Sequence, residues 1–337
     1  GWICWGVWTA GVFTRWFANI YHWQWRILVP ASAAMELAAF LIFLRAVAGH
    51  KSEPGKKMQA WAGVVVTATA SFLAALIVNL GGCIYAAIKT DSPAFPRGLD
   101  QPFLFLLGWG VLVPMVLGFS ARWLPVFLGL RETDSAELVT SVVLIYAAVV
   151  AAGLGSFPLA TLILPGAALM AIFALSLFRE PVRAPKVIGV DVRFPLFVRL
   201  AYQWLMVASV LSLWAANSDR FGGIWGASRH ALTVGFVATM VFAIGSRVLP
   251  HFAGSARLFS TRLMLAALVL LNVGCALRVS SEILAYEGYA GWAWRVLPVS
   301  AVTELTAVTV FALNMVLTFL KPIARPYVAP AASQTRS

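Results

Sequence analysis

Long apolar segments recur along the whole 337-residue chain. Most are at least about 18 residues long, which lets an α-helix cross a hydrocarbon core of about 30 Å. The composition agrees, because 61% of the residues are hydrophobic and only 11% are charged, against roughly 45–50% and 25% in soluble domains. A soluble globule is excluded, and a membrane β-barrel would need short alternating segments instead. The sequence predicts an all-α integral membrane protein.

We predict that this sequence contains ten transmembrane helices, in a single polytopic domain over residues 1–324. Residues 325–337 have the Pro, Ala and Ser content of a disordered tail. The predicted spans are residues 1–20, 27–48, 60–88, 102–124, 136–154, 158–178, 194–216, 227–250, 261–281 and 299–320.

Internal repeats relate these spans to one another. Residues 115–129 match residues 240–254 at a constant offset of 125, and both segments contain Arg followed three residues later by Pro. Residues 23–37 match residues 292–305, with a Trp-x-Trp-Arg start and a later Ser-x-x-x-Glu. Three repeats of up to four helices, at positions a, b, c and d, therefore cover about 1–88, 102–216 and 227–320.

The first repeat lacks room for one helix on this scheme. Arg15, Arg122 and Arg247 are predicted to close the three a helices. Only eight residues separate Arg15 from Trp23, whereas 45 separate Arg247 from Trp292. We therefore hypothesise that a b helix is missing near Ile20–Tyr21 and a d-type helix before Gly1, so that the complete plan has twelve helices in three pseudo-symmetric four-helix sets.

The net charge of +12 indicates loop orientation rather than a nucleic-acid partner. On the predicted alternation 17 of the 25 Lys and Arg residues lie on one side and 7 on the other, with Arg199 inside a span. The positive-inside rule then places the C-terminus in the cytoplasm. Membrane lipid is the expected partner.

Four histidines are the main candidate cofactor ligands. His230 and His251 lie at the two ends of one predicted helix, and 21 residues at about 1.5 Å each separate them by about 30 Å. They cannot share one metal ion, but each could serve a separate haem or metal position, since imidazole suits haem iron and copper. The alternative is that interfacial histidines hydrogen-bond nearby backbone, which we favour for His22 and His50 in polar loop sequence.

The segment that starts at His230 resembles a known family. His230-Ala231-Leu232-Thr233-Val234-Gly235, then Met240, Arg247, His251 and Gly254, resembles the signature of the NnrS family. These are polytopic membrane proteins described as binding haem and copper and linked to the bacterial response to nitric oxide. Where that family has Gly-His-Thr-Gly-Arg, this chain has Pro250-His251-Phe252-Ala253-Gly254, so a role for the final Arg does not transfer.

The resemblance implies haem b, with copper as a second cofactor, in a bacterial cytoplasmic membrane. His230 and His251 would be axial ligands of separate sites, and Arg247 would contact a haem propionate. His22 and His50 are secondary cofactor candidates. Three sets of four helices also resemble haem–copper oxidase catalytic subunits, but those need six histidines, so oxygen or nitric-oxide reduction by that mechanism is unsupported.

Glu36 and Glu304 are the carboxylates well inside the predicted spans, at equivalent positions of the repeat. An ionisable residue in a membrane span is a functional hypothesis by default, because its charge is costly there. The alternative is a neutral or paired Glu that ties helix c to a neighbour through a carbonyl or an Arg. Repetition slightly favours this structural role, since a proton path needs no symmetry.

Other motifs give no chemistry. Cys4, Cys83 and Cys275 are widely spaced and form neither a disulfide framework nor a CxxC site. A P-loop, a HExxH motif and a nucleophile elbow are absent from the sequence, so no catalytic residue is predicted. We expect a haem-binding membrane protein of nitric-oxide response or membrane redox chemistry. The alternatives are a non-catalytic anchor or electron-transfer subunit of a larger respiratory complex, and a proton-coupled transporter using Glu36 and Glu304.

Overall fold

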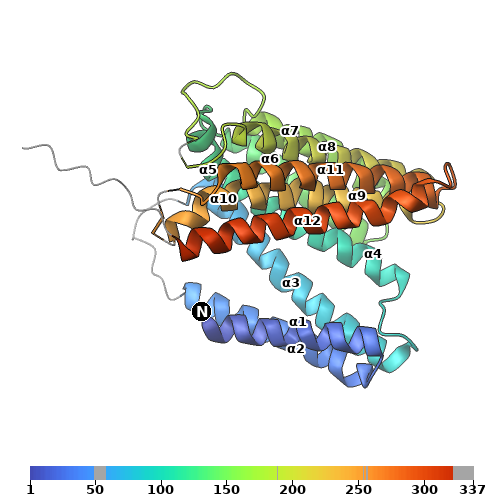
Figure 1. Cartoon of the computed structure of the whole chain (residues 1–337). Helices are drawn as coiled ribbons and strands as arrows, with labels where there is room; N and C mark the ends of the chain where they lie inside the picture. The colour runs from blue at the N-terminus through green and yellow to red at the C-terminus, as the bar shows by residue number, and fades with distance from the viewer. Residues whose placement is uncertain (49–57, 188, 253, 256, 322–337) are drawn as a thin grey trace, which may run out of the picture. The chain divides into compact units, whose positions relative to one another are not determined.

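A computed structural model describes residues 1–48, 58–187, 189–252, 254–255 and 257–321. The described residues form helices and loops, without a strand, as the sequence predicted (Figure 1). Nine helices within these ranges are long and apolar enough to cross a membrane. The chain is therefore an integral membrane protein. His50 and the predicted tail over 325–337 lie outside the described residues.

The chain divides into two compact units. Unit 1 consists of Gly1–Val182 and Ser212–Ser218, and unit 2 consists of Arg183–Leu211 and Asp219–Ser337.

Unit 1 contains two helical hairpins, the helix α3 and a long helix with an irregular centre. In unit 1, α1 packs on α2, α2 on α3, and α6 on α7. The long helix, Arg97–Leu128, combines α4, a π-helical segment η1 and α5. The bounds are α1 Trp2–Tyr21, α2 Trp25–Ala48, α3 Ala60–Lys89, α4 Arg97–Phe105, η1 Leu106–Leu112, α5 Val113–Leu128, α6 Ser135–Gly153 and α7 Phe157–Ala174.

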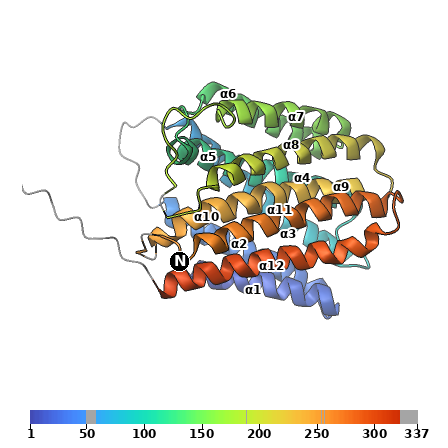
Figure 2. The same cartoon turned by 45° about the horizontal axis from the view of Figure 1, so that its top comes forward.

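Unit 2 is built around α11, which packs along α12 and also contacts a second long helix with a π-helical centre (Figure 2). That long helix, Gly223–Phe252, combines α9, η2 and α10. The helix α8, Phe194–Ser218, belongs to unit 2 as far as Leu211. The other bounds are α9 Gly223–His230, η2 Ala231–Ala238, α10 Thr239–Phe252, α11 Thr261–Tyr286 and α12 Ala293–Leu320.

The first of the ten predicted spans differs from the rest. The structure gives it as a helix of 20 residues, but α1 is not among the nine apolar candidates. Four tryptophans, Arg15 and Asn19 lie within α1, and these residues lower its mean hydropathy. Indole side chains suit the membrane interface better than its centre.

The backbone repeats the 125-residue offset found in the sequence. The π-helical segment η1 begins at Leu106 and η2 begins at Ala231, which is the same offset that relates Met115 to Met240. Phe105 and His230 are thus the equivalent residues directly before each segment. Short π-helical segments inside α-helices are often found at functional sites.

Two hairpins, α1–α2 and α11–α12, share one packing arrangement. A β-carbon on Gly11 would lie 3.0 Å from the backbone oxygen of Ser32 and 3.3 Å from Cγ of Glu36. A β-carbon on Gly274 would meet Ser300 and Glu304 in the same way, at 3.4 Å and 2.6 Å. In each first helix an Arg follows the glycine by four residues, at Arg15 and Arg278.

This correspondence assigns α1 to position b of the first repeat, as the equivalent of α11 in the third repeat, and overturns the predicted loss of a b helix near Ile20–Tyr21. The helix continues for six residues beyond Arg15 to Tyr21, so Arg15 does not close an a helix. The chain then reaches α2 at Trp25 through a short turn in which His22 and Gln24 have left-handed φ angles of 52° and 47°. The eight-residue spacing that suggested a deletion is therefore the end of a helix followed by a tight turn.

Candidate functional site

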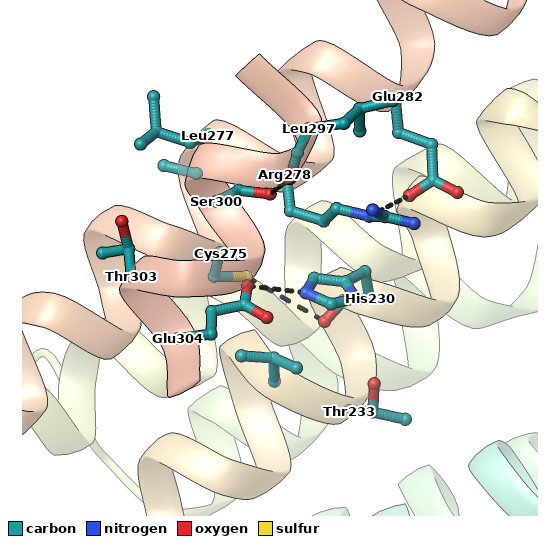
Figure 3. Close-up of polar contacts among 12 residues, drawn as sticks. His230, Thr233, Cys275, Leu277, Arg278, Glu282, Leu297, Ser300, Thr303 and Glu304 are labelled. Carbon is teal, nitrogen blue, oxygen red and sulfur yellow. Dashed lines mark hydrogen bonds and ion pairs between the residues drawn. The ribbon is translucent and has the colours of Figure 1, made fainter. Parts of the chain in front are cut away.

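The imidazole of His230 and the carboxyl of Glu304 form a short contact in unit 2. His230 is the last residue of α9, directly before η2, and Glu304 lies in the middle of α12. The distance from Nε2 of His230 to Oε1 of Glu304 is 2.7 Å, and the side chains are 23% and 16% exposed. Figure 3 shows the two side chains pointing toward one another. The short distance means that the nitrogen and the oxygen share a proton in a hydrogen bond.

Glycines allow α9 and α12, the helices that carry this pair, to pack closely against α11. A β-carbon on Gly274 of α11 would lie 2.6 Å from Cγ and 3.2 Å from the backbone nitrogen of Glu304. A β-carbon on Gly223 of α9 would lie 2.7 Å from Cβ of Tyr286 on α11. Small residues at such contacts are typical of helix packing in membranes. The sequence thus brings α9 and α12 together through α11.

A second polar pair lies next to the imidazole, on α11 (Figure 3). Arg278 Nε donates to Oε2 of Glu282 at 3.1 Å, one helical turn away. Glu282 is only 8% exposed, and the sequence analysis missed it because the predicted span ended one residue before it. The helix continues to Tyr286. The Arg-x-x-x-Glu spacing of Arg278 and Glu282 is the sequence signal that indicates this pair, because residues four apart lie on one face of a helix.

The other intramembrane acid, Glu36, belongs to a buried network in unit 1. Arg15 Nη2 donates to Oε2 of Glu36 at 3.0 Å, and Arg15 Nη1 donates to Oδ1 of Asn79 at 3.0 Å. Asn79 Nδ2 donates to the same Glu36 oxygen at 3.1 Å, and Arg15 Nε donates to Ser32 Oγ at 3.2 Å. Glu36 is therefore paired with an Arg, which is the structural alternative considered above. Such a pair is stable in a membrane because its charges and hydrogen-bonding groups satisfy each other.

The remaining predicted ligands lie apart from these clusters. His22 is exposed in the turn between α1 and α2. His251 is exposed near the end of α10, and its Nδ1 lies 3.1 Å from the backbone oxygen of Arg247, one turn earlier. His230 and His251 lie toward opposite ends of the long helix Gly223–Phe252, as separate sites require. Arg122 was predicted to close a helix, and its guanidinium lies 5.7 Å from the ring centroids of Trp61 and Trp123.

A metal site made only of protein ligands does not form in the described part of the chain. Within those ranges, groups of three or more His, Cys, Asp or Glu side chains that could hold one ion are absent. A haem needs fewer protein ligands, because the porphyrin supplies four nitrogens and the protein supplies only the axial positions. His230, with its carboxyl partner Glu304, offers one imidazole, which is too few donors for an ion bound by protein ligands alone.

Comparison with known families gives one match. The model of a domain of unknown function, DUF8744, matches residues 111–320, which is more than half of the chain. The chain belongs to the DUF8744 family. The DUF8744 match includes His230, His251, Arg278 and Glu304, whereas the Arg15 network precedes it. No curated protein matches the chain.

Proposed function

We propose that this chain is a haem-binding membrane protein in which His230 is an axial ligand. The observation that carries the proposal is the 2.7 Å contact between His230 Nε2 and Glu304 Oε1 inside apolar helices. Histidines that bind metals commonly donate their other ring N–H to a carboxylate, which fixes the tautomer and the orientation of the ring. The adjoining segment η2 adds support, since π-helical turns are frequent at functional sites.

The tautomer determines which nitrogen is available. When Nε2 of His230 carries the proton and donates it to Glu304, Nδ1 holds the ring's lone pair and would be the atom that holds a haem iron. Glu304 is then a positioning residue, because it orients the imidazole without touching the iron. A bound haem would supply an iron that carries one electron and binds a gas such as nitric oxide. The resemblance to the NnrS family supports nitric-oxide response as the process. Copper, the second cofactor that the resemblance implies, has no site of three or more protein ligands in the described residues.

His251 supplies the second proposed position. Its Nδ1 lies within hydrogen-bonding distance of the Arg247 carbonyl, which leaves Nε2 for a ligand. Arg247 lies one helical turn earlier, where its guanidinium would contact a propionate. The three-repeat plan and an orientation with the C-terminus in the cytoplasm of a bacterium belong to the same proposal. With α1 at position b, Arg15 lies within a helix and is no longer counted on the cytoplasmic side, and the other positive residues keep their sides.

A reduced-minus-oxidised absorption spectrum of the purified full-length protein tests this function, together with haem extraction and metal analysis of the same sample. We expect sharp b-type bands that weaken strongly in His230→Ala. His22→Ala is the matched control, because His22 is exposed in a turn, and it should leave the bands unchanged. A featureless spectrum from folded wild-type protein would remove haem from the account.

A further inference from the structure

Unit 1 contains a cavity of about 170 Å³ beside the Arg15 network. Side chains from α1, α2, α3 and α4 line it, together with Pro93 and Phe95 of the loop between α3 and α4. A cavity of roughly 150 Å³ is enough to bind benzene. The space therefore holds one six-membered ring, and it is too small for the four pyrrole rings of a haem.

Two aromatic side chains form one wall of the cavity. Phe95 and Phe103 pack edge to face, with ring centroids 5.5 Å apart and an interplanar angle of 62°. Phe95 lies directly on α3 at Gly82, where an added β-carbon would be 2.7 Å from its Cζ atom. A wall of this kind favours a flat, apolar ring, because aromatic pairs gain energy beyond the area that they bury.

Hydrogen-bonding groups also face the same space. Arg15, Asn79 and Asp100 line the cavity. The bonds of Arg15 to Ser32, Asn79 and Glu36 use three N–H groups, whereas a guanidinium has five. The other two can donate to an oxygen on a ligand. The carboxyl of Asp100 can accept from a ligand hydroxyl group.

A ring with these partners has a defined chemistry. It must be apolar enough to enter a membrane protein, must fit against Phe95 and Phe103, and must carry oxygens that accept from Arg15. When the ring is reduced, a hydroxyl hydrogen would find its acceptor at Asp100. We propose that this cavity binds the ring of a quinone or of the corresponding quinol. The proposal does not rest on haem at His230, because it concerns binding alone and different residues.

Calorimetric titration of the full-length protein in detergent with decylubiquinone and decylubiquinol tests the site. We expect saturable binding of both, and none of decylbenzene, which has the same decyl chain on a six-membered ring but carries no oxygen. Asp100→Leu should weaken quinol binding by about tenfold, since a hydrogen bond to a charged group is lost, and should change quinone binding little. Asp91→Asn is the control, because Asp91 is an exposed loop residue that pairs with Arg26.

Thiol protection provides a second readout that needs no destabilising variant. Cys83 and Cys275 are both buried, but Cys83 lines the cavity of unit 1, whereas Cys275 lies in unit 2. We expect decylubiquinone to slow alkylation of Cys83 by N-ethylmaleimide several-fold and to leave the rates at Cys4 and Cys275 unchanged. Lack of saturable quinone binding, equal binding of decylbenzene, or a Cys83 rate that quinone does not change would each overturn the proposal.

Discussion

Glu304 Oε1 lies 2.7 Å from Nε2 of His230 across 74 residues of sequence. The contact joins α12 to the junction between α9 and η2, where the long helix changes from α to π geometry. Both side chains are largely withdrawn from the surface, so each has the other as its polar partner in an apolar environment. The imidazole and the carboxyl group thus hold each other in place between the helices of unit 2.

The close contact at Gly274 makes the packing around the His230–Glu304 pair sensitive to side-chain size. Gly274→Val should destabilise the protein by about 2 kcal/mol, because a β-carbon there overlaps Cγ of Glu304 and overpacking costs roughly 1–3 kcal/mol. Gly166→Val is the control, since nothing lies within 4 Å of a β-carbon at Gly166. Thermal unfolding in detergent measures both variants. Equal melting temperatures would show that α11 and α12 do not pack as described.

The Arg15–Glu36 pair should show strong coupling. Glu36→Leu alone leaves Arg15 without its carboxylate partner and should cost roughly 3 kcal/mol, because an unpaired charge then remains among apolar helices. Adding Arg15→Met should recover most of this loss. The free energies of unfolding of the two single variants and the double variant form the cycle. Additive losses would contradict the pairing.

The turn of the chain into α6 depends on one side chain. Asp134 Oδ1 accepts from the backbone N–H groups of Ala136 and Glu137 at 2.9 Å and 3.0 Å. Asp134→Ala should therefore reduce the free energy of unfolding by about 1 kcal/mol, and Asp134→Ser should restore most of it. Glu132→Ala, at an exposed loop position, should have little effect. A loss in Asp134→Ser as large as that in Asp134→Ala would argue against the cap.

Hydropathy was sufficient to predict most helices. Nine predicted spans correspond to apolar helices of the structure, because the length of an apolar run is a local property of the sequence. Hydropathy predicts helix ends less accurately: it predicts that this span ends before Glu282, whereas α11 continues to Tyr286. Polar residues near a helix end resemble loop residues when packing is unknown.

The partners of the charged residues could not be predicted in the same way. The repeat predicts Arg15 at the end of an a helix, yet Arg15 lies within α1 and pairs with Glu36 of the next helix. The equivalence of Glu36 and Glu304 was visible in the sequence, but their different partners, Arg15 and His230, depend on which helices pack together. These contacts depend on how the helices pack, and helix packing cannot be predicted from a single sequence.

We propose that His230 binds haem iron and is not only a hydrogen-bond partner of Glu304. The most direct measurement is the absorption spectrum of purified His230→Gly with and without added imidazole. We predict that the variant loses the b-type bands assigned to this site and that millimolar imidazole restores them by occupying the vacated ligand position. Bands identical to those of the wild type in His230→Gly would show that the ligand lies elsewhere and would contradict the account.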